Sequence, residues 1–273
     1  MSLDGRPFGY EKVIKCDCKA EMPSDHIFIF WRILKMEKNE RITEDCKKAE
    51  NLNNDTELVF IIDRSGSMSG LEADTIGGFN SMIAKQRSEG EGTVYVTTVL
   101  FNSHSEMIHD REPIHKIEPM NERTYFVGGC TALYDAIGDT IQHIASMHRY
   151  LRREDVPAHT IFVITTDGYE NASRTFERIK VKDMIKYRTE KFGWEFIFVA
   201  ANIDAVETAA HIGIREQRAA NYVHSSRGIK DCYDAMNDFV CMSRSCSIAP
   251  SDVSWKKKLE KNDADKVKDK QQK

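Results

Sequence analysis

Short apolar runs alternate with amphipathic stretches through the middle of the chain. The runs are rich in β-branched and aromatic side chains, as expected of strands that are buried on both faces. We predict strands at residues 58–62, 94–101, 160–165 and 196–201, a weaker strand at 222–223 and an antiparallel edge strand at 106–109. Apolar positions at helical spacing predict helices at 71–87, 132–147, 174–191, 205–212 and 229–242. This alternation indicates an α/β fold with a mostly parallel sheet and helices on both faces.

Composition divides the chain into three zones. Residues 1–55 are irregular and charged, with one apolar burst at 27–34, and are an N-terminal extension whose role the sequence does not indicate. Residues 56–247 hold the alternating strands and helices and are the predicted domain. From residue 248 the chain becomes rich in Lys and Asp, which predicts a charged, flexible tail in which residues 256–258 are solvated.

Bulk properties argue against several classes of function. The net charge of −4 gives no reason to expect a nucleic-acid partner. No apolar run reaches the roughly 20 residues that a membrane span requires, and we find no export signal near the N-terminus. The seven cysteines are an odd count, which fits reduced thiols better than a disulfide framework. We therefore expect a cytoplasmic protein that binds neither nucleic acid nor membrane.

Oxygen-bearing side chains follow two of the predicted strands and precede a predicted helix. After the first strand comes Asp63-Arg64-Ser65-Gly66-Ser67, which has the pattern Asp-x-Ser-x-Ser. Thr131 follows a Gly-rich stretch directly before a helix, which predicts a position at or near the N-cap with an exposed hydroxyl. Asp167 follows the strand at 160–165. Ligands of open α/β sheets bind at the carboxyl ends of strands, and such oxygen donors suit Mg²⁺, Mn²⁺ or Ca²⁺ rather than zinc.

With these three segments the sequence resembles the von Willebrand factor type A family. In that family a metal-ion-dependent adhesion site combines the Asp-x-Ser-x-Ser loop, a Thr after a Gly-rich loop and an Asp after the fourth strand. The matching positions in this sequence, in the family's order, are Asp63, Ser65, Ser67, Thr131 and Asp167. The resemblance spans about residues 56–240, and the run at 60–68 looks most similar to stand-alone intracellular bacterial or phage-type members.

The resemblance implies both a fold and a function. The fold is a Rossmann-like open sheet of order 3-2-1-4-5-6 with one antiparallel edge strand, which places Asp63 and Asp167 close together. Two neighbouring carboxylates repel each other unless a cation lies between them. The implied function is protein binding without catalysis, in which Mg²⁺, or else Mn²⁺ or Ca²⁺, bridges to an Asp or Glu of a partner protein. Ser65 and Ser67 are the expected direct ligands, and the other three bind directly or through water.

Two residues beside the expected ligands qualify this interpretation. Cys130 stands where a small or hydroxyl side chain is expected, so that loop depends on Thr131 alone for a hydroxyl. Arg64 adjoins Asp63 and could compete with a cation. A domain that keeps the fold but no longer binds metal is therefore a second hypothesis.

A serine hydrolase is the enzyme hypothesis. Residues 66–70 match Gly-x-Ser-x-Gly, the nucleophile elbow of α/β-hydrolases, with Ser69 as nucleophile and Asp167 with His211 or His224 as its partners. Against this hypothesis, an elbow serine lies almost at the end of its strand, whereas residues 63–66 intervene here. Those hydrolases also place several strands before the elbow.

Cys16, Cys18, His26 and Cys46 form a candidate zinc site in the N-terminal extension. Structural zinc pairs usually have two to four residues between their cysteines, and a single residue separates Cys16 from Cys18. Unrelated reduced thiols are the preferred interpretation.

Overall fold

The computed structural model describes residues 54–89, 92–245, 249 and 251–263, and these form an α/β domain around one six-stranded sheet. The strand order is β3-β2-β1-β4-β5-β6, and each neighbouring pair is parallel except β2 with β3. The predicted strand order and the antiparallel edge strand are therefore confirmed. The strands are β1 (Thr56–Asp63), β2 (Val94–Phe101), β3 (Ser105–Pro113), β4 (His159–Thr166), β5 (Glu195–Ala200) and β6 (Ala219–Asn221).

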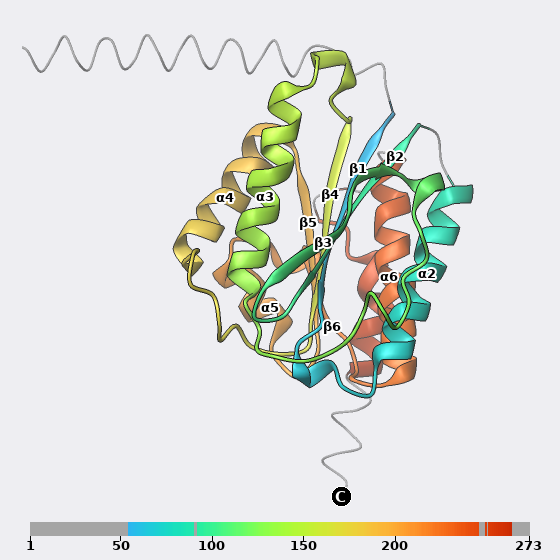
Figure 1. Cartoon of the computed structure of the whole chain (residues 1–273), viewed down its shortest axis with the longest axis vertical. Helices are drawn as coiled ribbons and strands as arrows, with labels where there is room; N and C mark the ends of the chain where they lie inside the picture. The colour runs from blue at the N-terminus through green and yellow to red at the C-terminus, as the bar shows by residue number, and fades with distance from the viewer. Residues whose placement is uncertain (1–53, 90–91, 246–248, 250, 264–273) are drawn as a thin grey trace, which may run out of the picture. The chain divides into compact units, whose positions relative to one another are not determined.

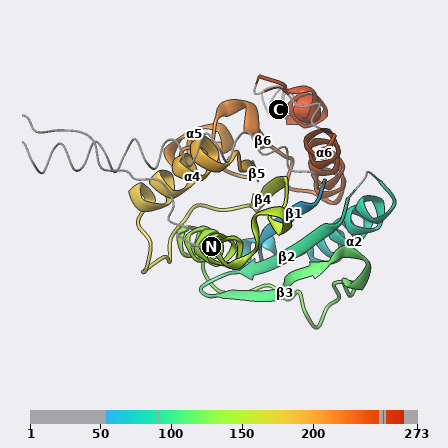
Figure 2. The ribbon, with the colours of Figure 1, turned by 90° about the horizontal axis from the view of Figure 1, so that it is seen from above.

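Helices cover both faces of the sheet (Figure 1). One face carries α3 (Leu133–Tyr150), α4 (Arg178–Phe192) and α5 (Ala205–His211), and the other carries α2 (Glu72–Ser88) and α6 (Ser226–Arg244). Figure 2 shows β3 at one edge of the sheet, beside β2. Short 3-10 turns connect the elements: η1 (Gly66–Met68), η2 (Ile114–Lys116), η3 (Arg153–Asp155), η4 (Glu216–Arg218) and η5 (Ser254–Lys256).

The position of β1 in the middle of the sheet explains why residues 58–62 are a continuous apolar run. Successive side chains of a strand point to opposite faces of a sheet. Phe60 and Ile62 accordingly pack in the core beneath α2 and α6, whereas Val59 and Ile61 pack in the core beneath α3, α4 and α5. Every residue of β1 is buried, so both faces require apolar side chains.

Two predicted elements begin at different residues in the structure. The last strand is β6 at Ala219–Asn221 instead of 222–223, and Tyr222 follows it as a buried residue. The helix predicted from residue 174 begins at Arg178. The reason is Asp135, whose carboxylate accepts hydrogen bonds from the backbone N–H groups of residues 174–176 and so holds that segment outside the helix.

The C-terminal segment differs from the solvated tail that its composition predicts. Residues 254–263 form η5 and a following helical stretch, with Trp255 and Leu259 buried. The Trp255 indole N–H donates to the Gln217 carbonyl (3.1 Å). Lys256 is also buried, and its ammonium donates to two backbone carbonyls, those of Glu216 and Ala219. Trp255 and Leu259, four residues apart, form one apolar helix face among the lysines, and a count of charged residues conceals it.

The N-terminal extension, with its apolar burst at 27–34 and the candidate zinc ligands, lies outside the described residues. In the described part of the chain, every helix is too short or too polar to cross a membrane.

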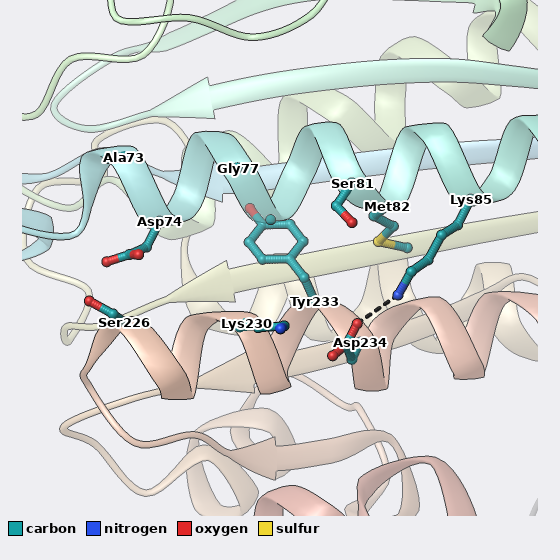
Figure 3. A pocket seen from close by; sticks show the side chains of 11 residues that line it. Ala73, Asp74, Gly77, Ser81, Met82, Lys85, Ser226, Lys230, Tyr233 and Asp234 are labelled. Atoms are coloured by element: carbon teal, nitrogen blue, oxygen red, sulfur yellow. Dashed lines mark hydrogen bonds and ion pairs between the residues drawn. The ribbon is translucent and has the colours of Figure 1, made fainter.

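A hollow of about 610 Å³ lies between α2 and α6 (Figure 3). It opens beside Gly77, where an added Cβ would meet no atom within 4 Å. The next residue is different, because a Cβ on Gly78 would lie 2.2 Å from Cδ2 of Tyr233. Figure 3 shows the Tyr233 ring projecting from α6 toward α2. Gly78 therefore lets the two helices pack closely around this ring, and the predicted metal ligands lie elsewhere in the domain.

Candidate metal site

The predicted ligands meet because β1 and β4 are neighbours in the sheet. Ile62 pairs with Thr165 in parallel strands. Asp63 at the end of β1 and Asp167 just after β4 therefore lie together at the carboxyl ends of the two strands. The Gly-rich loop before α3 is bonded to the loop after β1. The Gly66 N–H donates to the Gly129 carbonyl (3.1 Å), and the Gly128 N–H donates to the Arg64 carbonyl (2.9 Å). Three distant stretches of sequence thus converge at one place.

Hydrogen bonds join four of the five predicted ligands. The Ser65 and Ser67 hydroxyls are 3.0 Å apart, and the Ser67 hydroxyl donates to Asp167 Oδ1 at 2.5 Å. Asp63 accepts the Ser65 backbone N–H at Oδ1 and the Thr166 hydroxyl at Oδ2, both at 2.6 Å. Asp63 is therefore held by groups that follow β1 and end β4, and Asp167 is held by Ser67 from the loop after β1.

Thr131, the fifth predicted ligand, faces the same space, but its local setting differs from the prediction. Thr131 directly precedes Ala132, the N-cap of α3, as predicted, but its side chain is buried instead of exposed. Its backbone is clamped by Asn171, whose side chain accepts the Thr131 N–H (2.9 Å) and whose own N–H donates to the Thr131 carbonyl (3.0 Å). A Cβ on Gly168 would lie 3.4 Å from Ser67 Oγ and 3.8 Å from Thr131 Oγ1. The missing side chain of Gly168 keeps the space between these two hydroxyls open.

The electrostatic setting favours a cation. Burial raises the pKa of Asp63, and the Asp167 carboxylate acts in the same direction, against the hydrogen bonds from Thr166 and Ser65, which lower it. The ionised form of Asp63 is therefore disfavoured in this place without a counter-charge. A bound divalent cation would supply that counter-charge to both carboxylates.

Arg64 does not supply the positive counter-charge to the two carboxylates. The Arg64 guanidinium forms an ion pair with Glu106 of β3 (2.7 Å) and lies 4.7 Å from the centre of the Phe126 ring. These contacts hold its charge on the β3 side of the loop. The possibility that Arg64 competes with a metal is therefore not supported by its position.

The donor set fits a hard divalent cation. Among the described residues, no cluster of three or more His, Cys, Asp or Glu side chains could hold a metal. The converging side chains are two carboxylates and three hydroxyls, which are the oxygen donors that Mg²⁺, Mn²⁺ and Ca²⁺ prefer. Neighbouring ligands of an octahedral ion with bonds of about 2.1 Å are about 3 Å apart, as the Ser65 and Ser67 oxygens are.

Sequence reasoning missed two residues of this site and assigned a third only to the alternative hydrolase. Thr166 and Asn171 fix Asp63 and Thr131, and both adjoin segments that the sequence singled out. His224 contacts Asp167 through Nε2, at 3.1 Å from Oδ2. It lies between β6 and α6, and the sequence suggests it only as a partner of Asp167 in the hydrolase hypothesis, not as a residue of the metal site.

The arrangement proposed for a hydrolase is only partly present. His224 contacts Asp167, but through Nε2, the nitrogen that faces the serine in a Ser-His-Asp triad, whereas Nδ1 faces the acid. Ser69 is an exposed residue, and no hydrogen bond between its side chain and a histidine occurs in the described ranges. The nucleophile and the histidine are thus not joined.

Comparisons with solved structures give matches of low sequence identity. Proximal thread matrix protein 1 from the mussel byssus is 12% identical, over 70% of this chain and 47% of that protein, with a TM-score of 0.47. The vWF domain of the type V pili tip protein Mfa5 from Porphyromonas gingivalis is 10% identical, over 70% and 97%, with a TM-score of 0.49. Manganese-loaded TRAP protein from Plasmodium vivax is 14% identical, over 66% and 72%, with a TM-score of 0.46. The match thus spans less than half of the mussel protein's length.

A family model identifies the family of this chain. A search of curated protein sequences found no match. The family model for the von Willebrand factor type A domain matches residues 57–230, which include all five predicted ligands and, except for the first residue of β1, the strands β1 to β6. With the strand order described above, this match establishes that the chain belongs to the von Willebrand factor type A domain family.

Proposed function

We propose that this domain is a metal-dependent protein-binding module. In this proposal the domain holds a divalent cation, Mg²⁺, Mn²⁺ or Ca²⁺, and through it binds an Asp or Glu side chain of a partner protein. One observation carries the proposal: hydrogen bonds connect Asp63, Ser65, Ser67 and Asp167 at the carboxyl ends of β1 and β4. The residues that would hold the cation are Asp63, Ser65, Ser67, Thr131 and Asp167.

The charge of the donor set supports binding of a further carboxylate. Two of the five side chains carry negative charge, and the three hydroxyls are neutral. A divalent cation in such a site is not neutralised beyond its own charge and usually keeps water in some ligand positions. When bound, it supplies positive charge at a position that an acidic side chain can reach.

Exposure indicates the side from which a partner would approach. Asp63 and Asp167 are buried, whereas Ser67 is exposed, so the site opens on the Ser67 side. Two large side chains of the same loops are also exposed, Phe126 (53%) and Tyr169 (65%). Aromatic side chains are enriched at protein interfaces, where they contribute much of the binding energy. In this proposal they offer a partner apolar contacts on the loops that carry the ligands.

Other expectations from the sequence stay predictions. These are a cytoplasmic, stand-alone intracellular protein of bacterial or phage type, no nucleic-acid or membrane partner, and no catalysis. In the hydrolase hypothesis His224 contacts Asp167 through Nε2 instead of the Nδ1 that a triad uses, and a contact from Ser69 is lacking. Protein binding is therefore the preferred function.

Selection from a random peptide library tests this function without knowledge of the partner. Peptides are captured on the parent protein in Mn²⁺ and eluted with EDTA, and the same selection is made on Asp63→Asn. We expect the eluted peptides to require a single Asp or Glu, so that its replacement by Asn or Gln abolishes binding, and the Asp63→Asn protein to yield none of them. Peptides that bind equally in EDTA, or that need no carboxylate, would show the proposal to be wrong.

A further inference from the structure

His224 contacts the predicted metal site from a loop that holds none of the five predicted ligands. Its Nε2 lies 3.1 Å from Asp167 Oδ2, and its side chain is 25% exposed. The other oxygen of that carboxylate, Oδ1, accepts the Ser67 hydroxyl. Asp167 is thus held at both oxygens, by Ser67 on one side and by His224 on the other.

The fold fixes the position of His224 at both ends of its short loop. Before it, the buried Tyr222 donates its N–H to the Ala200 carbonyl at the end of β5 (2.9 Å). After it, Ser225 caps α6 by accepting the Gly228 N–H (3.1 Å). A Cβ on Gly228 would lie only 1.7 Å from the Val223 carbonyl oxygen, so the loop and the helix can adopt this close packing only with glycine there. The imidazole therefore reaches Asp167 from an anchored backbone.

The chemistry of this contact assigns the direction of the hydrogen bond. An ionised carboxylate only accepts hydrogen bonds, so Nε2 carries the proton and donates it to Asp167. Carboxylates in metal sites are commonly oriented in this way by a neighbouring donor. Removal of such a donor typically lowers metal affinity by 10- to 100-fold, because the carboxylate is then free to rotate away.

We propose that His224 is a positioning residue of the metal site, which turns Asp167 so that Oδ1 faces Ser67 and the cation. The inference rests on the proposed metal binding and adds a residue from the loop before α6 to the site. His224 acts through Asp167 and stays outside the set of direct ligands, because it contacts the oxygen opposite to the one that faces the serines.

The test measures Mn²⁺ binding to the full chain from the loss of the free Mn²⁺ signal in electron paramagnetic resonance. We expect the Kd of His224→Ala to rise by about 10- to 100-fold over the parent. We expect the Kd of His224→Gln to stay within a few-fold, since the glutamine Nε2 can donate to the same oxygen. The matched control is His211→Ala, on an exposed histidine at the end of α5, with an unchanged Kd. Unfolding in EDTA confirms that each variant is folded.

The possible outcomes separate this inference from the proposed function. If the parent does not bind Mn²⁺, both are wrong. If the parent binds and His224→Ala binds equally well, or His224→Gln is as weak as His224→Ala, only the positioning role is wrong. Electron spin-echo modulation of the bound Mn²⁺ gives a further readout. Coupling to an imidazole nitrogen that disappears in His224→Gln would make His224 a direct ligand and would overturn its role as a positioning residue.

Discussion

The hydroxyl of Ser67 donates a 2.5 Å hydrogen bond to Asp167, 100 positions further along the chain. Ser67 lies in the turn after β1 and Asp167 directly after β4, so the bond joins the carboxyl ends of two adjacent strands. It exists because the sheet order places β4 beside β1. The same order makes the site depend on the fold, because neither loop holds enough donors for a cation by itself.

The buried carboxylate of Asp63 predicts a specific dependence of stability on pH. Its pKa is raised above the ordinary value of 3.8, mainly by burial, so without metal the ionised group destabilises the folded state. This cost is present above the raised pKa and disappears as the pH falls toward 3.8. In EDTA we therefore expect the unfolding free energy of the parent, relative to Asp63→Asn, to increase as the pH is lowered from neutral.

Urea unfolding of both proteins at several pH values measures this difference. Saturating Mg²⁺ is the control. At neutral pH it should stabilise the parent and leave Asp63→Asn unchanged, because a ligand stabilises only the folded state that binds it. A difference between the two proteins that is independent of pH in EDTA would contradict the raised pKa.

Two serines of one short loop distinguish metal binding from hydrolysis. Ser67 bonds to both Ser65 and Asp167, whereas Ser69 is the nucleophile of the alternative hydrolase. We expect Ser67→Ala to weaken Mn²⁺ binding at least about tenfold and Ser69→Ala to leave it unchanged. Isothermal titration with Mn²⁺ measures both. Ester hydrolysis that persists in EDTA and is lost in Ser69→Ala would support the enzyme instead.

Adjacent glycines of α2 should respond to alanine in opposite directions. Gly77 borders open space, so Gly77→Ala should stabilise the protein by up to about 1 kcal/mol through its higher helix propensity. A Cβ on Gly78 would meet the Tyr233 ring, so Gly78→Ala should cost about 1–3 kcal/mol. Urea unfolding measures both changes. If Gly78→Ala is as stable as Gly77→Ala, the close packing of α2 on α6 is incorrect.

The docked C-terminal segment predicts a large effect of a single tryptophan. Trp255 is buried, lies 5.5 Å from Phe239 between ring centroids and donates to the Gln217 carbonyl. Trp255→Ala should therefore lower the unfolding free energy by about 3–5 kcal/mol. The exposed neighbour Lys257 is the control, and Lys257→Ala should change it by no more than about 0.5 kcal/mol. Equal effects of the two substitutions would mean that this segment does not pack on the domain.

Local sequence patterns predict part of this structure. The continuous apolar run of β1 predicts a strand buried on both faces, and the five oxygen-bearing residues, in the order that the family resemblance supplies, predict which loops converge. Contacts between distant segments are not contained in such patterns. The start of α4 depends on Asp135, 43 positions before Arg178, and the burial of Trp255 depends on Gln217 and Phe239. His224 is a mixed example, because the sequence suggests it, beside His211, only as a partner of Asp167 in a hydrolase, and the folded chain brings it to Asp167 among the predicted metal ligands.

The most direct test of the proposed metal site is a crystal structure of the protein grown with Mn²⁺, with diffraction recorded at the manganese absorption edge. We predict one strong anomalous peak about 2.2 Å from both Ser65 Oγ and Ser67 Oγ, in the space beside Gly168. The same crystals of Asp63→Asn should show no peak there. Ordered Ser65 and Ser67 side chains at saturating Mn²⁺ with no peak between them would contradict the account.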